Sequence, residues 1–377
     1  MENALFFFPD ISGFTSFVTS TERIHSSHLI TELLESVLAE NELNLELREV
    51  EGDAIFFLRT GAPPSVSELL AQVKRMFLAF HTHLQIIERD NVCQCGACRN
   101  ASNLTLKFIA HYGTVETTTI AGQRKVTGSD VILAHRLLKS GIPEREYLVF
   151  PESYPSSIDS TAESAWAQWQ EFETEFEHFG RLRLRYLSCS PLLREVPEVA
   201  SIPDPTPRGR AKNVRMHIEA PLLLVHAVLI DPESKKAYTP GLKDSVTPTP
   251  INRVNSTHTC VFEDFEVHFV TRQNTVQKES ITYKETADIS AGFSFIADYR
   301  LREVEGGTDV LLRVFPQSGE QIGSGGVPAV LRRMKARVLQ FAALRGTKSG
   351  LQRFKDYCEE LAQTEEGRSY RRGDTAG

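Results

Sequence analysis

The chain has no apolar run long enough to cross a membrane, and no basic stretch precedes its first apolar run. A spanning helix needs about 20 consecutive apolar residues, and polar residues interrupt every apolar run of this sequence well before that length. A secretory signal peptide begins with lysine or arginine, whereas this chain begins Met-Glu-Asn. We therefore expect neither a membrane span nor a signal peptide.

The chain also lacks an excess of basic residues and a set of cysteines distributed along the sequence. The sequence has 42 Lys and Arg against 49 Asp and Glu, a net charge of -7. Nucleic-acid binding depends on a basic face, so no nucleic-acid partner is expected. Of six cysteines, three lie within residues 93–98, unlike the spaced framework of a secreted disulfide protein. This usage predicts a reducing, cytoplasmic location.

Two short apolar runs, LFFF and AIFFL, each have an aspartate at one end. Both runs are brief and rich in aromatic residues, which predicts buried strands. Asp10 follows the first run and Asp53 precedes the second, with Gly13 and Gly52 close by. Carboxylates held at strand ends are suitable ligands for Mg²⁺, which takes its other ligands from water or substrate phosphates.

These residues carry a family resemblance. FPDISGFTSFV (residues 8–18) and EVEGDAIFF (residues 49–57) resemble the metal-binding pair of class III nucleotidyl cyclases, and TGSDVILAHRLLK (residues 127–139) resembles a later helix start of that family. More narrowly, the chain resembles a bacterial family of unknown function, DUF2652, which adds a C-x-C-x-x-C insert. The resemblance covers about residues 1–190 and implies an α+β, ferredoxin-like cyclase fold.

Class III cyclases join the ribose 3′ hydroxyl to the α-phosphate and release pyrophosphate, with two metal ions holding the attacking and leaving oxygens. The family's site lies between two protomers, so the resemblance implies a homodimer that binds a nucleoside triphosphate. It also implies roles for individual residues: two Mg²⁺ or Mn²⁺ ions at Asp10, Ile11 and Asp53, phosphate approach at Gly13 and Phe14, and charge stabilisation by Arg136.

The nucleoside half of this resemblance is incomplete. The family's ribose-positioning asparagine is replaced by Ile132, which cannot hydrogen-bond a sugar, and Asp130 is the candidate substitute. Glu49 stands at the first base-reading position, where glutamate is the guanylyl cyclase choice. Lys125 stands at the second and matches neither standard specificity. Alternatively, Glu49 is a solvated strand residue and Arg136 an ordinary surface charge.

Cys93, Cys95 and Cys98 form a compact thiol cluster around Gly96. Three thiolates in this spacing can surround one Zn²⁺ and leave one coordination position. His111 is our expected fourth ligand, and the other candidates are His81 and His83. An iron–sulfur site lacks a nearby fourth cysteine, and a metal-free, redox-sensitive cluster is the remaining alternative.

The chain is long for one core, and its middle predicts a domain boundary. Residues 191–210 are expected to form a linker, because residues 196–210 hold four prolines and almost no periodic pattern. Residues 211–365 read as strands followed by a long C-terminal helix, and AP-x-x-x-V, DPE and Y-x-PG near their start resemble the helix-grip fold of START-like and polyketide-cyclase-like (SRPBCC) domains. We expect residues 366–377 to form a flexible tail. The helix-grip resemblance implies a pocket for a hydrophobic ligand, lined by Phe265, Phe269, Phe295 and Tyr299.

The sequence thus predicts a cytoplasmic two-domain signalling protein. A cyclase-like domain binds a nucleotide with divalent metal and forms a cyclic nucleotide, and a helix-grip domain binds a hydrophobic regulator. Two alternatives stay open. The first is an inactive cyclase fold that serves nucleotide sensing or dimerisation. The second is a START-like small-molecule-binding protein whose activity lies in the C-terminal domain.

Overall fold

The computed structural model describes residues 2–14, 17, 23–120, 123–154, 166–200, 207, 210–248, 251–290, 293–317 and 349–372. The chain divides into two compact units. The first comprises Met1–Thr19, Ser26–Glu88 and Asn100–Ala200, and the second comprises Ser20–His25, Arg89–Arg99 and Ser201–Gly377. The cysteine insert, which the sequence places in the first domain, therefore groups with the second unit.

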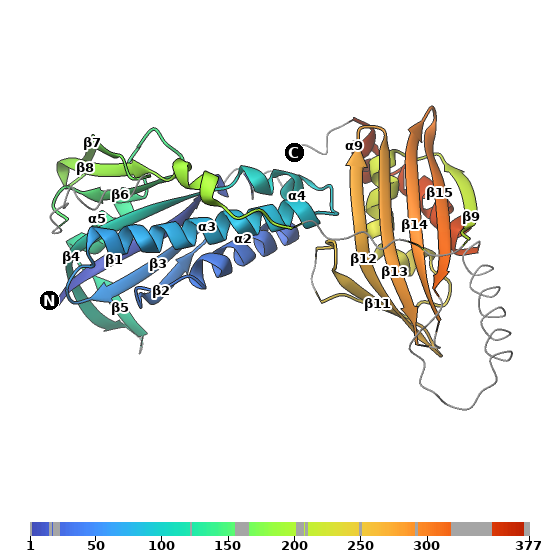
Figure 1. The fold of residues 1–377 in the computed structure, drawn as a ribbon, viewed down its shortest axis with the longest axis horizontal. Coiled ribbons are helices and arrows are strands. Elements are labelled where there is room, and N and C mark those ends of the chain that lie inside the picture. Colours follow the sequence, from blue (N-terminus) through green and yellow to red (C-terminus); the bar gives the residue numbers. More distant parts are fainter. Residues whose placement is uncertain are drawn as a thin grey trace. The chain divides into compact units, whose positions relative to one another are not determined.

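The first unit is built on a mixed sheet with the strand order β2-β3-β1-β4-β6-β8-β7, with β5 paired to β4 (Figure 1). The β4–β6 pair is parallel, and the other pairs are antiparallel. The strands are β1 (Glu2–Ser12), β2 (Glu46–Glu51), β3 (Ala54–Thr60), β4 (Thr105–Ile120), β5 (Gln123–Thr127), β6 (Tyr147–Pro151), β7 (Trp169–Phe176) and β8 (Gly180–Ser188). The β7–β8 pair is a hairpin that turns just before Gly180.

Strand β1 is central and buried on both faces, which explains its continuous apolar run. Phe6 and Phe8 face a core that includes Leu133 and Leu137 of α5 (Ser129–Leu137). The opposite face is covered by α2 (Arg23–Leu38) and α3 (Val66–Asp90) (Figure 1). The chain between α3 and β4 forms α4 (Gly96–Asn100) and η1 (Ala101–Asn103).

Helix α3 begins with a capping box. Ser65 Oγ accepts a hydrogen bond from the backbone N–H of Glu68, and Glu68 Oε2 accepts one from the backbone N–H of Ser65. This reciprocal arrangement satisfies two amides at the helix start.

The second unit is built on an antiparallel sheet with the strand order β10-β11-β12-β13-β14-β15-β9 (Figure 1). The strands are β9 (Lys212–Ile218), β10 (Asp244–Val246), β11 (Thr257–Val261), β12 (Glu266–Gln277), β13 (Ser280–Ile289), β14 (Phe293–Val304) and β15 (Gly307–Gln317). A short η2 (Ser190–Glu195) lies in the first unit, inside the stretch predicted as a linker.

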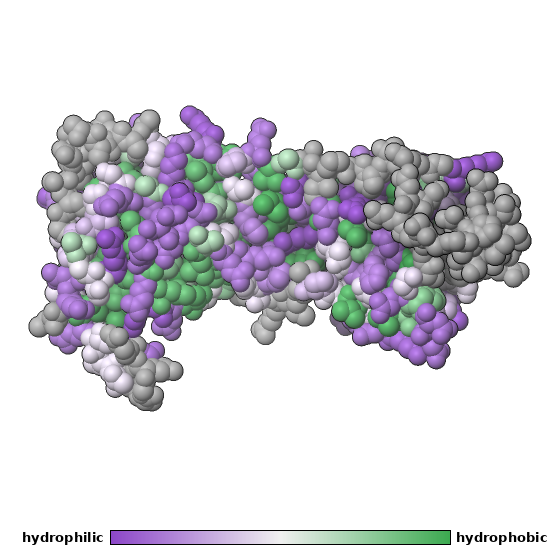
Figure 2. All heavy atoms as spheres, turned by 60° about the horizontal axis from the view of Figure 1, so that its bottom comes forward, coloured by the Kyte–Doolittle hydropathy of each residue, from purple (hydrophilic) through white to green (hydrophobic). Residues whose placement is uncertain are grey.

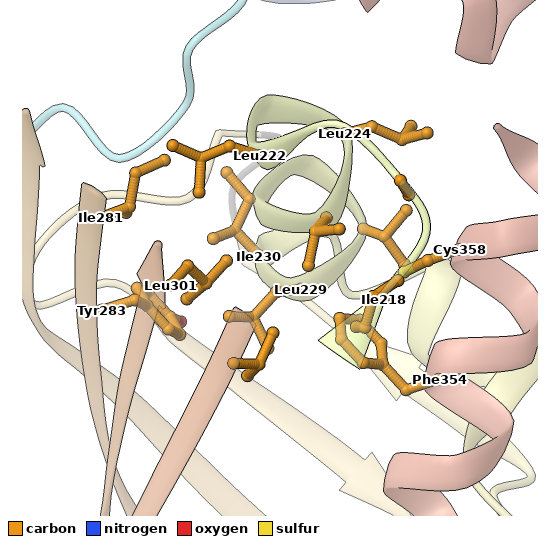
Figure 3. Packing of buried hydrophobic residues seen from close by; sticks show 14 of the residues in the cluster. Ile218, Leu222, Leu224, Leu229, Ile230, Ile281, Tyr283, Leu301, Phe354 and Cys358 are labelled. Atoms are coloured by element: carbon orange, nitrogen blue, oxygen red, sulfur yellow. The ribbon is translucent and has the colours of Figure 1, made fainter. Parts of the chain in front are cut away.

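Helix α6 (Leu222–Ile230) is the centre of this unit's core. Apart from His226 it is apolar on every side, as expected of a helix enclosed by other elements. Leu229 and Ile230 pack with Tyr283 and Leu301 of the sheet (Figure 3). Phe354 and Cys358, in a helical stretch over residues 349–361, join the same cluster. The first part of the long C-terminal helix that the sequence predicts lies outside the described residues.

Two short helices complete the second unit. Helix α7 (Ser234–Tyr238) follows α6, and α9 (Glu365–Arg372) occupies most of the stretch that we expected to be a flexible tail. That expectation was wrong for residues 366–372. Both units are thus α+β, as the sequence predicts.

Hydrophilic side chains cover much of the visible surface, with apolar patches between them (Figure 2). Among the apolar residues that remain exposed are Leu47 and Val50 of β2 and Ile132 of α5. No helix among the described residues is long and apolar enough to span a membrane.

Candidate functional site

The two predicted aspartates lie next to each other in the first unit. Asp10, near the end of β1, is opposite Ala54 of β3 in the strand register. Asp53 lies in the turn between β2 and β3, where its carbonyl accepts a hydrogen bond of 3.0 Å from the backbone N–H of Ile11. Pairing of β1 with β3 therefore brings together two carboxylates that are separated by over forty residues in the sequence.

Asp10 is buried and Asp53 is partly buried, and this raises the proton affinity of both carboxylates. Burial raises the pKa of Asp10, although the Lys107 ammonium opposes the shift. Burial, followed by the neighbouring Asp10 charge, raises the pKa of Asp53 to about 6. Like charges held close together in a desolvated place favour protonation or a bound cation. A cation placed between the two carboxylates would relieve this repulsion.

Lys107 is the residue of this site that the sequence did not single out. It lies directly opposite Asp10 in the β1–β4 register, and its Nζ lies 2.9 Å from Asp10 Oδ2 and 3.2 Å from the carbonyl oxygen of Leu138. Its neighbours Leu106 and Phe108 are fully buried, but a lysine between two apolar residues is ordinary strand alternation, so no local pattern singles it out. Its ammonium compensates one of the two carboxylates.

Two glycines shape the backbone beside this pair. Gly13 has φ +93° and Gly52 has φ +66°, both in the left-handed region that favours glycine. The Phe14 ring lies 3.6 Å from the position that a Cβ on Gly52 would occupy. The turn after β1 therefore packs closely against the turn before β3. The turn after β1 contains Gly13 and Phe14, which the family resemblance places next to the phosphates of a nucleotide.

The carboxylate of Asp130 already has hydrogen-bond partners within the chain, whereas we expected it to hydrogen-bond the ribose of a nucleotide. Its Oδ1 lies 2.8 Å from His111 Nε2, and its Oδ2 accepts hydrogen bonds from the backbone N–H and the hydroxyl of Thr114. Burial alone would raise the pKa of Asp130, but these bonds from His111 and Thr114 outweigh it and lower the pKa. Asp130 therefore joins α5 to β4.

The remaining predicted nucleotide residues are exposed. Glu49 lies on β2 and Lys125 on β5, and both side chains face solvent. Arg136 is exposed on α5, whereas its neighbour His135 packs edge-on against Phe8. No described contact brings Glu49, Lys125 or Arg136 to the aspartates within one chain. Their expected roles stay predictions.

The cysteine cluster has a histidine partner, but not the one expected. The ligand atoms of His25, Cys93, Cys95 and Cys98 all lie within 4.8 Å of one another, and all four residues belong to the second unit. His111 is bound to Asp130 instead, and His81 Nε2 lies 2.8 Å from Glu146. The expectation of His111 as the fourth member was therefore wrong. The donor set of one imidazole and three thiols is compatible with zinc.

Hydrogen bonds and packing fix this cluster to the second sheet. The N–H of Val254 donates to the carbonyl of Asp90 (2.8 Å), Asn91 bridges to Arg253, and Val92 is fully buried in the core around α6. The close neighbours Cys93 and Cys95 raise the pKa of the Cys98 thiol. Thiolates at this spacing need a positive charge among them.

The second unit also contains an ionisable group of residues that the sequence did not reveal. Lys235 of α7 lies with its Nζ 2.8 Å from His258 Nε2 and 3.3 Å from Glu285 Oε2. Each of these residues is at least nine-tenths buried. The Tyr283 hydroxyl donates to Glu285 Oε2 over 3.2 Å. We call Lys235, His258, Glu285 and Tyr283 the inner polar cluster.

Two of the four residues predicted to line a ligand pocket lie beside this cluster. Lys235 Nζ is 4.5 Å from the centre of the Phe269 ring, and the ring centres of Tyr299 and Tyr283 are 6.1 Å apart. Phe295 packs against Ala297 and Leu312. Phe265 was placed wrongly: it is 39% exposed and stacks on Phe262. It precedes β12, so the alternation of that strand does not extend to it.

The family of the chain follows from its sequence matches. Residues 30–147 match the profile described as "Protein of unknown function (DUF2652)". The "Uncharacterized protein Rv2561/Rv2562" of Mycobacterium tuberculosis (strain ATCC 25618 / H37Rv) is 32% identical over 161 residues, which are 43% of this chain and 74% of that protein. The chain therefore belongs to this family of proteins of unknown function.

Among solved structures, the chain is similar to class III nucleotidyl cyclase domains. The guanylate cyclase domain of RhGC from Catenaria anguillulae in complex with GTP is 17% identical, with a TM-score of 0.36 over 50% of this chain and 96% of that one. The adenylyl cyclase CyaB from P. aeruginosa is 14% identical, with a TM-score of 0.35 over 49% and 93%. Similarity at this level supports no conclusion about activity.

Proposed function

We propose that the first unit binds a nucleoside triphosphate together with a divalent cation at Asp10 and Asp53, and that the protein acts as a nucleotide-binding signalling protein. The observation that carries this proposal is the pair of adjacent carboxylates, in which burial and the Asp10 charge raise the pKa of Asp53 to about 6. A bound divalent cation relieves this repulsion and offers its remaining positions to phosphate oxygens.

The residues around the pair support a phosphate ligand. Lys107 compensates one carboxylate, which leaves one net negative charge at the pair when both aspartates are ionised. A divalent ion then makes the site positive, which favours a phosphate chain. The backbone at Gly13 can approach such a ligand closely because Gly13 has no side chain.

We propose binding rather than cyclisation as the activity of this site. The sugar hydroxyl must be oriented for attack on the α-phosphate, and Ile132, at the position of the family's asparagine, is 55% exposed and has no hydrogen-bonding group. Asp130 has both oxygens engaged by His111 and Thr114. The exposed Arg136 is accessible to a nucleotide on a second copy, in keeping with the homodimer that the sequence resemblance implies.

Product analysis tests binding against cyclisation. The full chain is incubated with each of the four nucleoside triphosphates and Mg²⁺ or Mn²⁺, and bound and released nucleotides are separated and identified. We expect retained, unconverted triphosphate with the wild type, loss of retention in Asp53→Asn, and no change in the control Asp309→Asn, which alters an exposed carboxylate of β15. If the wild type instead released a cyclic nucleotide and Asp53→Asn released none, the protein would be a cyclase, and the assignment of binding alone would be contradicted.

A second candidate function concerns the second unit. We propose that the inner polar cluster marks a binding site for a small aromatic or lipid-like molecule that carries an oxygen acceptor. Burying an ammonium, an imidazole and a carboxylate is costly, and such groups cluster at functional sites more often than in plain cores. Phe269 supplies apolar contact area beside the Lys235 ammonium, and Tyr299 supplies it beside Tyr283.

Native mass spectrometry of the purified full chain tests this second function. We expect a co-purified small molecule on the wild type that is reduced in Lys235→Met and retained in the surface control Lys243→Met. Wild-type protein that carries no added mass, and gains none from a panel of fatty acids and aromatic acids, would contradict it.

A further inference from the structure

The cysteine insert is arranged as a metal site whose geometry can be compared with that of a known ion. His25 lies in the first turn of α2, and the three cysteines lie in and just before α4. His25 Nδ1 is 3.3 Å from Cys95 Sγ, 3.6 Å from Cys93 Sγ and 3.7 Å from Cys98 Sγ. One nitrogen thus faces three sulfurs at nearly equal distances.

These distances match the edges of a tetrahedron around zinc. Zn–S bonds of about 2.3 Å and Zn–N bonds of about 2.0–2.1 Å at tetrahedral angles place nitrogen and sulfur about 3.5 Å apart. The three observed separations lie on either side of this value. Side chains that merely packed together would have no reason to meet through their ligand atoms at this spacing.

The surrounding hydrogen bonds support the same reading. The backbone N–H of Cys98 points at Cys95 Sγ over 3.5 Å, and Asn91 Nδ2 donates to the carbonyl of Cys98 over 3.1 Å. Metal sites typically have such outer hydrogen bonds, which hold the ligand residues in place. None of the six cysteines forms a disulfide, so no disulfide competes for these sulfurs.

We propose that His25, Cys93, Cys95 and Cys98 bind one Zn²⁺ as a closed, structural site of the second unit. Three thiolates and one imidazole in tetrahedral arrangement select zinc over the oxygen-preferring Mg²⁺ and Mn²⁺. Four protein ligands leave no open position for water or substrate, so the ion is structural. It stabilises the insert, whose preceding residue Val92 is part of the buried core.

Metal analysis of the full chain tests the composition of this site. We expect one zinc per chain, released stoichiometrically when the thiols are modified by an organomercurial. Cobalt substitution should give the intense visible bands of a tetrahedral ion and a thiolate charge-transfer band. Wild-type protein that holds iron with sulfide, or that binds neither zinc nor cobalt through thiolates, would overturn the proposal.

Substitutions at His25 test the fourth ligand. His25→Ala should weaken zinc binding at least tenfold, while His25→Cys should keep one zinc and add a fourth thiolate to the cobalt spectrum. Because His25→Cys preserves the coordination number, it separates loss of a ligand from loss of folding. The matched control His28→Gln lies three residues further along α2 and should leave zinc affinity and the cobalt spectrum unchanged. Wild-type affinity and an unaltered spectrum in His25→Ala would remove His25 from the site.

Discussion

Lys107 Nζ lies 2.9 Å from Asp10 Oδ2 across the β1–β4 pair, beside the two aspartates that form the candidate cation site. An ammonium at this distance competes with a divalent ion for the same carboxylate. Both side chains of the pair are largely buried, so solvent screens this competition only in part.

Replacing Lys107 by methionine should therefore increase divalent metal affinity. We expect Lys107→Met to bind Mn²⁺ about tenfold more tightly, a change of about 1.4 kcal/mol, because a nearby positive charge is removed from a partly buried site. Titration followed by Mn²⁺ electron paramagnetic resonance measures this, with Lys139→Met, an exposed lysine, as the control. Weaker or unchanged binding in Lys107→Met would show that the ammonium does not oppose the ion.

The raised pKa of Asp53 predicts a stability cost at neutral pH. The unfolded chain releases the proton near the ordinary pKa of 3.8, while the folded chain holds it until about pH 6. Stability is therefore lost as pH rises through this window. After allowance for partial exposure, Asp53→Asn should stabilise metal-free protein by about 1 kcal/mol at pH 7.5 and by less at pH 5. Urea denaturation at the two pH values decides; equal or lower stability of the variant at pH 7.5 would contradict the coupling.

His226 should make the second unit sensitive to acid. Its Nε2 donates to Asn274 Oδ1 over 2.9 Å, and among the described residues its buried Nδ1 has no hydrogen-bond partner. Burial lowers the pKa of His226 to about 4. The unfolded chain takes up the proton near 6.5 and the folded chain does not, so stability falls as pH drops from 6.5 to 4.

The expected loss by pH 4 is about 3 kcal/mol from this residue. His226→Gln keeps a donor for Asn274 and should flatten the pH dependence of the denaturation midpoint in that range. Because Asn274 Nδ2 also donates to the carbonyls of Asn91 and Val92, acid should loosen the cysteine insert. An unaltered pH profile in His226→Gln would refute this account.

The inner polar cluster predicts non-additive effects of substitution. Lys235→Met should destabilise the protein by about 3 kcal/mol, because Glu285 is then left as an unpaired buried charge. Adding Glu285→Leu should restore part of that loss, since both charges are then gone. Chemical denaturation of the single and double variants measures the coupling. A double variant at the sum of the single effects would show that the two charges do not interact.

Local pattern was enough to predict the elements that position the aspartates. The LFFF and AIFFL runs form β1 and β3, and their pairing brings Asp10 and Asp53 together as expected. Lys107 was missed because its significance depends on the register of β1 with β4, which no local pattern encodes.

The other differences between sequence and structure also come from contacts over long distances. His25 and Cys93 are separated by 68 positions, and His25 lies in no motif, so the sequence drew attention to His111, His81 and His83 instead. Lys235 and Glu285 are separated by 50 positions, and each alone resembles an ordinary surface charge. Phe265 was misplaced for a local reason, because the beginning of β12 could not be fixed from alternation alone.

The central claim is tested most directly by the metal dependence of nucleotide binding. The affinity of the full chain for each nucleoside triphosphate is measured by isothermal titration calorimetry in Mg²⁺ and again in EDTA, for the wild type, Asp53→Asn and Asp309→Asn. We predict that at least one triphosphate binds at least tenfold more tightly with Mg²⁺ to the wild type and to Asp309→Asn, and that Asp53→Asn loses this difference. Equal affinity with and without Mg²⁺, or no binding of any triphosphate to the wild type, would contradict the proposed function.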